Sequence, residues 1–198
     1  MSPPPGVRFG ERTMKHSILW RRLDLPGHDF ARVVLRENRW ELSGTAVFAH
    51  GQSPCRLDYF VACDTGWRTR SARVCGVVGD REVDLTISVD AEQRWYMNGT
   101  ESTTVAGCVD IDLGFTPATN LLPIRRLSLG IGKEAEVAAS WLPFPSLELE
   151  LLPQVYRHEG EWTYRYESGG GTFVRVLEVN AVGLVTRYPG LWQAETTP

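Results

Sequence analysis

The chain has 198 residues, a formal net charge of −3 and an isoelectric point near 5.8. Its 21 basic residues are spread along the chain, which argues against a nucleic-acid partner because such partners require a concentrated basic surface. No run approaches the roughly 20 apolar residues that span a bilayer, so we predict no transmembrane segment. A chain of this length buries roughly 70% of its unfolded surface, so we expect one domain with its own core.

Residues 1–16 differ in character from the rest of the chain. Three consecutive prolines, Pro3 to Pro5, disfavour both helix and strand pairing, so we expect a flexible leader here and a single domain over 17–195. The leader has no apolar run that could act as a secretory signal, so we expect a cytoplasmic protein. Four cysteines without metal or disulfide spacing are then expected as free thiols, two or three of them buried: Cys55, Cys63, Cys75 and Cys108.

The dominant hydrophobic period is two. His28 to Glu37 has the apolar spacing of a short helix, but its β-branched pair favours extended structure. Clear alternation follows in four later segments: Leu57 to Cys63, Arg81 to Asp90, Leu147 to Leu151, and Trp162 to Tyr166. Strands with one apolar and one polar face are typical of antiparallel sheets.

Turn residues separate these segments at regular intervals. The expected hairpin joints are Arg36–Arg39, Asp64–Gly66, Gly79–Asp80, Asn98–Gly99, Gly130–Gly132, Gly169–Gly171 and Asn180–Gly183. They delimit about ten strands, several of them longer than the usual 5–6 residues. We therefore predict a mainly all-β fold in which one antiparallel sheet curls into a roll or partial barrel. The exception is a short helical turn near 116–122, with Thr116 as N-cap, Pro117 at the first helical position and Pro123 ending it.

The stretch from Gly107 to Leu129 gathers the most varied polar chemistry. On a strand, Cys108, Asp110 and Asp112 share one face and three apolar residues share the other,. If the apolar face is the core, the carboxylates face water. If the polar face lines a concave interior, they could serve as acid and base or bind a cation. Two aspartates without a third ligand specify no metal, and we predict neither a metal nor a cofactor.

The residues that follow add an amide and two cations. Asn120 lies in a turn that is either simply capped or a polar lining. Arg125 and Arg126 would point to opposite faces if extended. One of them could form an ion pair with Asp110 or Asp112, or hold an anionic head group through its planar guanidinium.

A second polar cluster runs from Trp67 to Arg73. Arg68 and Arg70 share one face, and Trp67 shares the other with Arg73. Aspartates on the flanking segments predict a solvated ion-pair ladder, or a polar pocket wall if this face turns inward. The seven tryptophans are expected mostly in the core,, and a curled sheet rich in aromatic residues can also enclose an apolar ligand.

Eight motifs occur in an order that resembles a bacterial family described as putative glycolipid-binding proteins, formerly a domain of unknown function. They stand at Trp67–Arg70, Trp95–Gly99, Gly107–Leu113, Thr116–Asn120, Leu122–Leu127, Phe144–Tyr156, Tyr164–Ser168 and Gly183–Trp192. The resemblance runs from about Ser17 to Glu195. It implies a spiral β-roll akin to bacterial lipoprotein carriers, and it supplies no established catalytic residues.

The expected function is binding of a glycolipid or other amphipathic molecule, with its tail in an apolar cavity. The residues expected to contact the ligand are Trp67, Arg68, Arg70, Asp110, Asp112, Asn120, Arg125, Arg126 and Tyr166. One alternative is an enzyme with Asp110 or Asp112 as base and Arg68 or Arg125 holding an anion. Another is a structural module that pairs a partner with an exposed sheet edge. We expect a monomer or homodimer.

Overall fold

A computed structural model describes residues 14–196 of the chain. The expected leader therefore lies outside the described residues, except at its end. The first strand begins at Lys15, so Lys15 and His16 belong to the sheet and not to the leader.

The described residues form one sheet of 15 strands. The first eight strands form a meander, each antiparallel to the one before it: β1 (Lys15–Arg22), β2 (Gly27–Arg36), β3 (Arg39–His50), β4 (Ser53–Asp64), β5 (Thr69–Val78), β6 (Arg81–Val89), β7 (Trp95–Met97) and β8 (Thr100–Glu101). The others are β9 (Asp110–Leu113), β10 (Glu134–Leu142), β11 (Glu150–Gly160), β12 (Thr163–Ser168), β13 (Phe173–Val179), β14 (Val185–Tyr188) and β15 (Trp192–Thr196). The strand count exceeds the predicted ten because several of these strands are very short.

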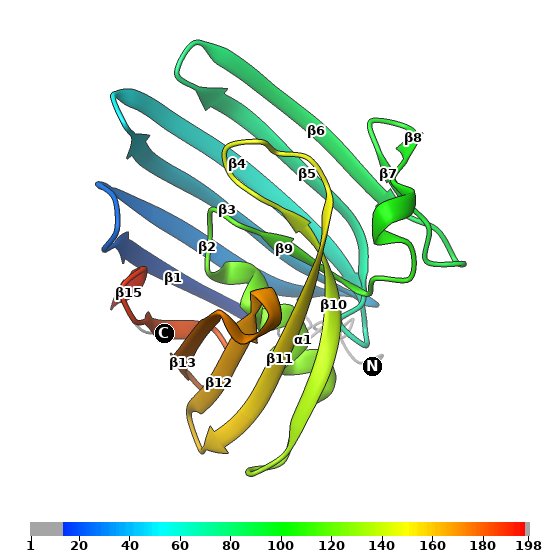
Figure 1. Ribbon diagram of the computed structural model, residues 1–198, viewed down its shortest axis with the longest axis vertical. Coiled ribbons are helices and arrows are strands. Elements are labelled where there is room, and N and C mark those ends of the chain that lie inside the picture. The colour runs from blue at the N-terminus through cyan, green and yellow to red at the C-terminus, as the bar shows by residue number, and fades with distance from the viewer. Residues whose placement is uncertain (1–13, 197–198) are drawn as a thin grey trace, which may run out of the picture.

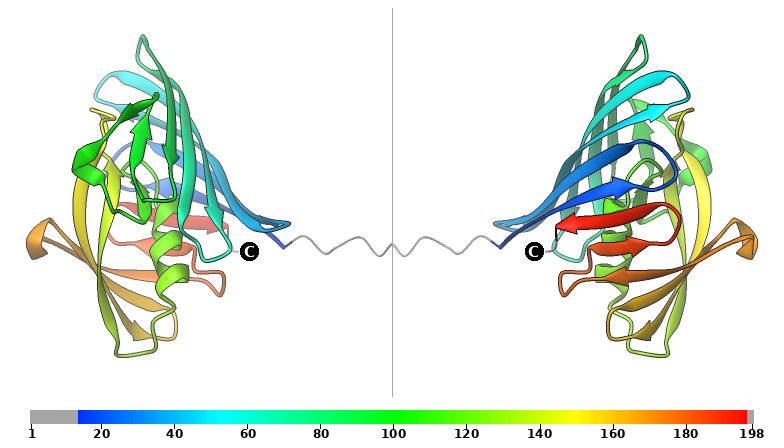
Figure 2. Two further views of the ribbon diagram at one scale, coloured as in Figure 1. Left: turned by 90° about the vertical axis from the view of Figure 1, so that its right-hand side faces the viewer. Right: turned by 90° about the vertical axis from the view of Figure 1, so that its left-hand side faces the viewer.

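The two halves of the sheet meet where the first strand pairs with the last, β1 with β15. The chain thus runs out from β1 to β8, crosses over, and returns from β9 to β15. Figures 1 and 2 show that the sheet curls so that the two halves face one another with a short helix, α1 (Leu121–Leu127), between them. The predicted all-β roll is confirmed, and the sheet is not closed.

Strand β9 breaks the predicted antiparallel pattern, because it pairs with β10 in parallel. Parallel neighbours need a long crossover, usually helical, and here the segment from Gly114 to Lys133 with α1 supplies it. The other edge of β9 returns to the beginning of β5: Thr69 donates its N–H to Val109 O at 3.1 Å, and its Oγ1 accepts the N–H of Ile111 at 3.1 Å. The β9 edge of the sheet therefore curls back against the beginning of β5.

The alternation predicted for β4 and β6 is confirmed in the core. Leu57, Tyr59, Val61 and Cys63 are all buried, as is Ile87 of β6. All four cysteines are free, and three of them, Cys55, Cys63 and Cys108, are buried. The interior is therefore lined by the apolar face of each long strand, as the period of two requires.

The helix differs from its prediction. A 3₁₀ turn, η2 (Ala118–Asn120), leads directly into α1, which continues to Leu127. Thr116 Oγ1 accepts the N–H of Ala118 at 3.0 Å, as expected of a cap. Pro123 does not end the helix. It is the third residue of α1, in the first turn, where backbone N–H groups have no intrahelical partner and proline is tolerated.

Three other expectations were wrong in detail. Leu147 and Leu149 are buried and Glu148 and Glu150 are exposed, as predicted, but Leu151 is 50% exposed. Leu147 has a positive φ of 56° and precedes β11, so the alternation ends at Glu150 and begins outside a strand. Trp162 lies in the turn between β11 and β12 and is 46% exposed. Gly130–Gly132 joins α1 to β10 and does not close a hairpin.

Candidate functional site

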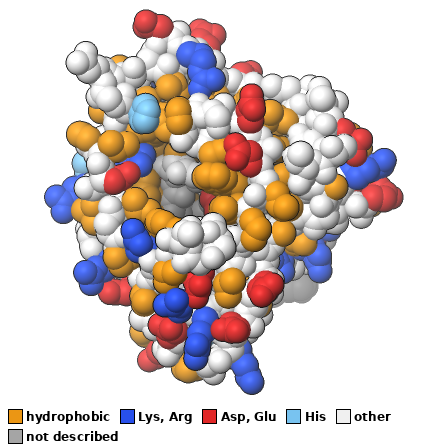
Figure 3. Space-filling model, viewed as in Figure 1, with side chains coloured by type: hydrophobic (Ala, Val, Ile, Leu, Met, Phe, Trp, Pro, Cys, Tyr) orange, Lys and Arg blue, Asp and Glu red, His pale blue; other side chains and the backbone are white. Residues whose placement is uncertain are grey.

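A cavity of about 420 Å³ is lined by residues of the half from β9 to β15 and of the crossover before β10, and we call it the amphipathic pocket. Its apolar walls come from strands β10 to β15 and the turns between them: Trp141, Leu152, Phe173, Tyr188, Leu191 and Trp192. Figure 3 shows a hollow near the centre of this face that is bordered mainly by hydrophobic side chains. The volume falls in the range of about 300–1,000 Å³ that is usual for small-molecule sites.

We call the polar lining residues of the amphipathic pocket, taken together, its polar end. They are Asp112, Thr116, Asn120, Tyr166 and Ser168. Gln154 donates its Nε2–H to Asp112 Oδ2 at 2.6 Å and lies 3.1 Å from Tyr166 Oη. Burial raises the pKa of Asp112 to about 6, although the hydrogen bond from Gln154 opposes this shift,. The pocket therefore offers a carboxylate that changes protonation state only slightly below neutral pH.

Asn120 is held in the same polar end by a tyrosine behind it. Its Nδ2 donates to Tyr156 Oη at 2.9 Å, and the rings of Tyr156 and Tyr166 lie 5.1 Å apart. Asn120 is the last residue of η2 and precedes α1. The crossover helix thus positions the amide, while β11 and β12 supply the tyrosines.

A second carboxylate, Asp29 of β2, lies fully buried behind Thr116. Thr116 Oγ1 donates a short hydrogen bond to it, and Tyr59 Oη lies 3.1 Å from Asp29 Oδ2. Burial raises the pKa of Asp29 to about 7 against these hydrogen bonds. Gly44 provides the space for the tyrosine, since a Cβ there would lie 2.2 Å from Tyr59 Oη.

Sequence reasoning missed Asp29, yet a signal was present. Asp29 occupies the same face of β2 as the buried Ala31 and Val33. A carboxylate at an apolar position of a period-two pattern is unusual, because a buried acid must be hydrogen-bonded or neutral.

Asp110 does not line the amphipathic pocket but forms a buried ion pair with Arg126 of α1. The guanidinium contacts both carboxylate oxygens, with Nη2 at 2.5 Å from Oδ2. Burial raises the pKa of Asp110 and the hydrogen bonds from Arg126 oppose that shift, while the same contact raises the pKa of Arg126. The predicted pairing of one arginine with one of these aspartates is confirmed.

Neither face of β9 points to water. Ile111 and Leu113 are buried on one side, and Asp110 is buried on the other, where α1 covers it. The interpretation in which both carboxylates face solvent was therefore wrong. The helix that crosses over β9 is what turns its polar face into interior.

The Trp67–Arg73 cluster lies apart from the amphipathic pocket. Arg70 pairs with Asp64 at 2.7 Å and Arg73 with Asp84 at 3.1 Å, both at the surface, so the predicted ladder is confirmed. Arg70 is an extra residue opposite β4, because Ser71 pairs with Ala62 and Thr69 with Cys63. This bulge places Arg70 and Arg73 on the same outer face, not on opposite faces as predicted.

The other residues of this cluster also lie outside the amphipathic pocket. The Arg68 side chain is exposed. Trp67 is buried and stacks on Trp40 with ring centroids 4.2 Å apart, and the guanidinium of Arg125 lies 5.6 Å from the Trp67 ring centroid. Of the nine predicted contact residues, the structure brings Asp112, Asn120 and Tyr166 to one pocket. It does not bring the other six there.

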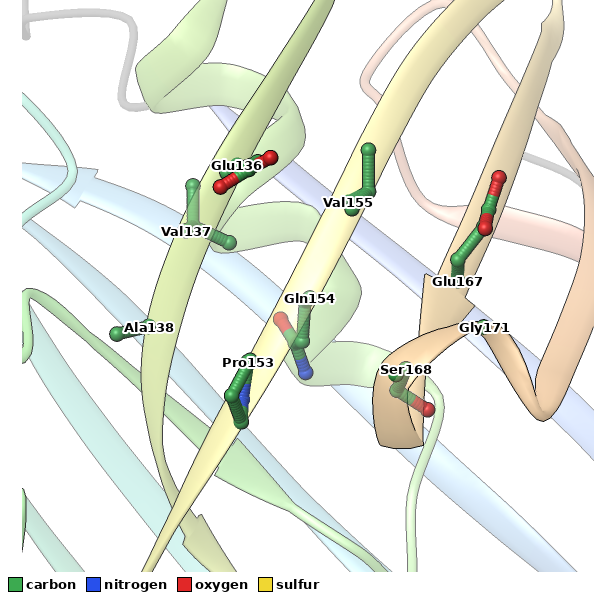
Figure 4. A pocket seen from close by; sticks show the side chains of 10 residues that line it. Glu136, Val137, Ala138, Pro153, Gln154, Val155, Glu167, Ser168 and Gly171 are labelled. Atoms are coloured by element: carbon green, nitrogen blue, oxygen red, sulfur yellow. The ribbon is translucent and has the colours of Figure 1, made fainter.

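A second hollow, the outer groove, crosses the solvent side of β10, β11 and β12 with a volume of about 480 Å³. Figure 4 shows its lining, in which neighbouring strands contribute Glu136, Ala138, Pro153, Val155 and Glu167. Most of these side chains are at least partly exposed. The amphipathic pocket, which is lined by more aromatic side chains and by a carboxylate with a raised pKa, is therefore the better candidate for a binding site,.

Two further findings concern residues 14–196. Within them, no group of three or more His, Cys, Asp or Glu side chains is arranged to hold a metal ion. No helix in this part of the chain is long and apolar enough to cross a membrane.

Comparison with known proteins identifies a family and a solved structure of similar fold. Residues 17–194 match the family described as "Putative glycolipid-binding". The crystal structure of a DUF1089 family protein from Pseudomonas aeruginosa is similar, with 28% sequence identity, 98% of each chain covered and a TM-score of 0.72. No curated protein matches. Because the family match spans nearly the whole chain, this protein belongs to the family described as putative glycolipid-binding.

Proposed function

We propose that the protein binds an amphipathic small molecule in the amphipathic pocket, and that a glycolipid is the class its family name indicates. The observation that carries the proposal is that one cavity is lined by both apolar and polar side chains. Trp141, Phe173 and Trp192 would contact the apolar part of the ligand. Asp112, Asn120 and Ser168 would contact its polar part.

The size of the pocket limits what enters it. Its volume of about 420 Å³ is near the lower end of the range of about 300–1,000 Å³ that is usual for small-molecule sites,. That is comparable with one sugar ring or a short acyl segment and much less than a complete two-chain lipid. The rest of a larger ligand would extend through the opening of the roll.

The polar end supports a hydroxyl-bearing head group. The Asp112 carboxylate accepts hydrogen bonds, while Ser168 and the amide of Asn120 can both donate and accept. Arg126 is engaged by Asp110, and no cation lines the pocket among the described residues. A neutral head group therefore fits this end better than an anionic one.

The test is titration of the purified protein with octyl β-D-glucopyranoside below its micelle concentration, followed by calorimetry. Ser168→Phe places a ring in the cavity and is expected to abolish binding, whereas the matched Ser168→Ala leaves the space open and retains it. Equal binding by both variants, or none by the wild type, would contradict the proposal.

General acid–base catalysis is a second candidate, because Asp112 combines a pocket position with a pKa raised to about 6,. Arg68 and Arg125, expected to hold an anionic substrate, line no part of this pocket. A screen of chromogenic glycosides and esters tests the candidate. Turnover that disappears in Asp112→Asn would favour catalysis, and absence of turnover at all pH values would remove it.

A further inference from the structure

A separate pocket of about 290 Å³ lies between the C-terminal end of α1 and strands β11 to β14; we call it the polar pocket. Tyr164 and Tyr166 are successive inward residues of β12 and line different pockets: Tyr164 lines the polar pocket and Tyr166 the amphipathic one. The polar pocket shares no lining residue with the amphipathic pocket, and its surface is mostly polar.

Asn180 lines the polar pocket and has a side-chain donor without a partner among the described residues. Its Oδ1 accepts the N–H groups of Val182 and Leu184, each at 3.0 Å, which fixes the orientation of the side chain. The Nδ2 atom is then buried and has no hydrogen-bond partner in the described part of the chain. A buried polar group without a partner is unfavourable, so a ligand acceptor placed here would stabilise it.

His158 presents the complementary acceptor. Its Nδ1 lies 2.6 Å from Leu129 O, and because a carbonyl oxygen can only accept, Nδ1 carries the hydrogen. In the tautomer with its hydrogen on Nδ1, the ring has an acceptor lone pair at Nε2, which is buried and unpartnered within residues 14–196,. Stacking on Tyr164, with ring centroids 4.4 Å apart and planes 3° from parallel, holds the ring in place.

One cationic and one anionic side chain line the polar pocket, so their formal charges cancel. Arg125 and Glu161 both line it, and neither forms an ion pair with another described residue. An anionic ligand would meet Glu161 and the carbonyl end of the α1 dipole. A cationic ligand would meet Arg125. Trp162, which is 46% exposed, adds an aromatic surface beside these groups.

We propose that the polar pocket binds a neutral polyhydroxylated ligand of the sugar class. A hydroxyl group both donates and accepts, so neighbouring hydroxyls can donate to His158 Nε2 and accept from Asn180 Nδ2. The ring of such a ligand could also lie against Trp162. The same chemistry is offered by a free sugar and by the sugar head group of a glycolipid. This inference does not depend on the proposed function of the amphipathic pocket.

The experiment uses ¹H–¹⁵N NMR of the full chain to follow the Asn180 side-chain amide and the His158 ring. One arm titrates a panel of methyl glycosides, and the other titrates octyl β-D-glucopyranoside. Asn180→Asp keeps the carbonyl-type acceptor for Val182 and Leu184 but removes the Nδ2 donor. His158→Asn keeps a donor for Leu129 O but removes Nε2. Asn38→Asp, in the exposed turn between β2 and β3, is the matched control.

We expect at least one methyl glycoside to shift both signals. Asn180→Asp and His158→Asn should each weaken binding about 10-fold or more. Asn38→Asp should bind as the wild type does. Shifts with octyl glucoside alone would support the head group as the source. The proposal is overturned if neither arm shifts these signals, in which case the pocket holds ordered water only. It is also overturned if Asn180→Asp and His158→Asn bind as the wild type does. Octyl glucoside binding that is lost in Ser168→Phe and never perturbs Asn180 would support the amphipathic pocket and contradict this one.

Discussion

The side-chain amide of Gln154 donates a hydrogen bond of 2.6 Å to Oδ2 of Asp112. The same nitrogen lies 3.1 Å from Tyr166 Oη, so one buried amide connects the carboxylate and the phenol of the amphipathic pocket. Because Gln154 carries no charge, its hydrogen bond only partly opposes the effect of burial on the pKa of Asp112,. The carboxylate is thereby oriented without being neutralised by a cation.

Replacing Gln154 should change the acidity of this carboxylate. In Gln154→Leu the hydrogen bond that favours the ionised form is lost, so the pKa of Asp112 is expected to rise further above about 6,. A pH titration of the Asp112 carboxyl ¹³C signal measures it. Gln52→Leu, in the exposed turn between β3 and β4, should leave that titration unchanged. An unaltered or lower value in Gln154→Leu would contradict the assignment.

Asp29 should make stability depend on pH. Its folded pKa of about 7 exceeds the ordinary value of 3.8, so the folded state holds this proton more tightly than the unfolded state. Its contribution to stability is complete below about pH 4 and is lost as pH rises through about 7.

The free energy of unfolding of the wild type, minus that of Asp29→Asn, should therefore fall between about pH 4 and pH 7, by roughly a few kcal/mol at most, and stay level at higher pH,. Urea unfolding at several pH values measures it, with Asp80→Asn in the exposed β5–β6 turn as control. A difference that stays constant across this range would show that Asp29 does not titrate there.

Removing only one partner of the ion pair between Asp110 and Arg126 should lower the free energy of unfolding strongly. Arg126→Met leaves the buried Asp110 without its cation and is expected to cost about 3–5 kcal/mol. The double variant Asp110→Leu/Arg126→Met should recover most of this loss, since both charges are removed together. Arg73→Met breaks an exposed pair with Asp84 and should cost less than about 1 kcal/mol. Equal losses for Arg126→Met and Arg73→Met would argue against a buried pair.

Thr69 should stabilise the point where the sheet curls back on itself. Thr69→Val removes the acceptor for the buried N–H of Ile111 and is expected to cost about 1–3 kcal/mol. Thr69→Ser keeps the hydroxyl and should lose much less. Thermal or urea unfolding compares the two, and similar losses would assign the effect to packing of the methyl group instead.

The period of two in β4 and β6 and the turn residues between strands predicted most of the sheet, because each long strand has one face in the core. The pattern could not predict the parallel pairing of β9 with β10, because a four-residue strand carries no signal of its direction. It also could not show that α1 covers Asp110, since that contact depends on where the crossover lies in space.

Part of the candidate site was predictable for a similar reason. Asp112 and Asn120 belong to one continuous stretch, so their proximity follows from the turn between them. Tyr166 was predicted on other grounds. It lies in a motif that carries the family resemblance and in a segment that alternates with a period of two. Asp29 lies behind Thr116 through long-range contacts, and Asn180 reaches the polar pocket through a turn, so neither position could be placed from local sequence.

The most direct test of the amphipathic pocket is a set of intermolecular nuclear Overhauser effects between bound octyl β-D-glucopyranoside and the protein. The structure predicts contacts from the alkyl protons to the rings of Phe173 and Tyr188, which line the apolar wall. Contacts confined to exposed residues such as Phe30, which is 46% exposed on the outer face, or no contacts at saturation, would contradict ligand binding inside the roll.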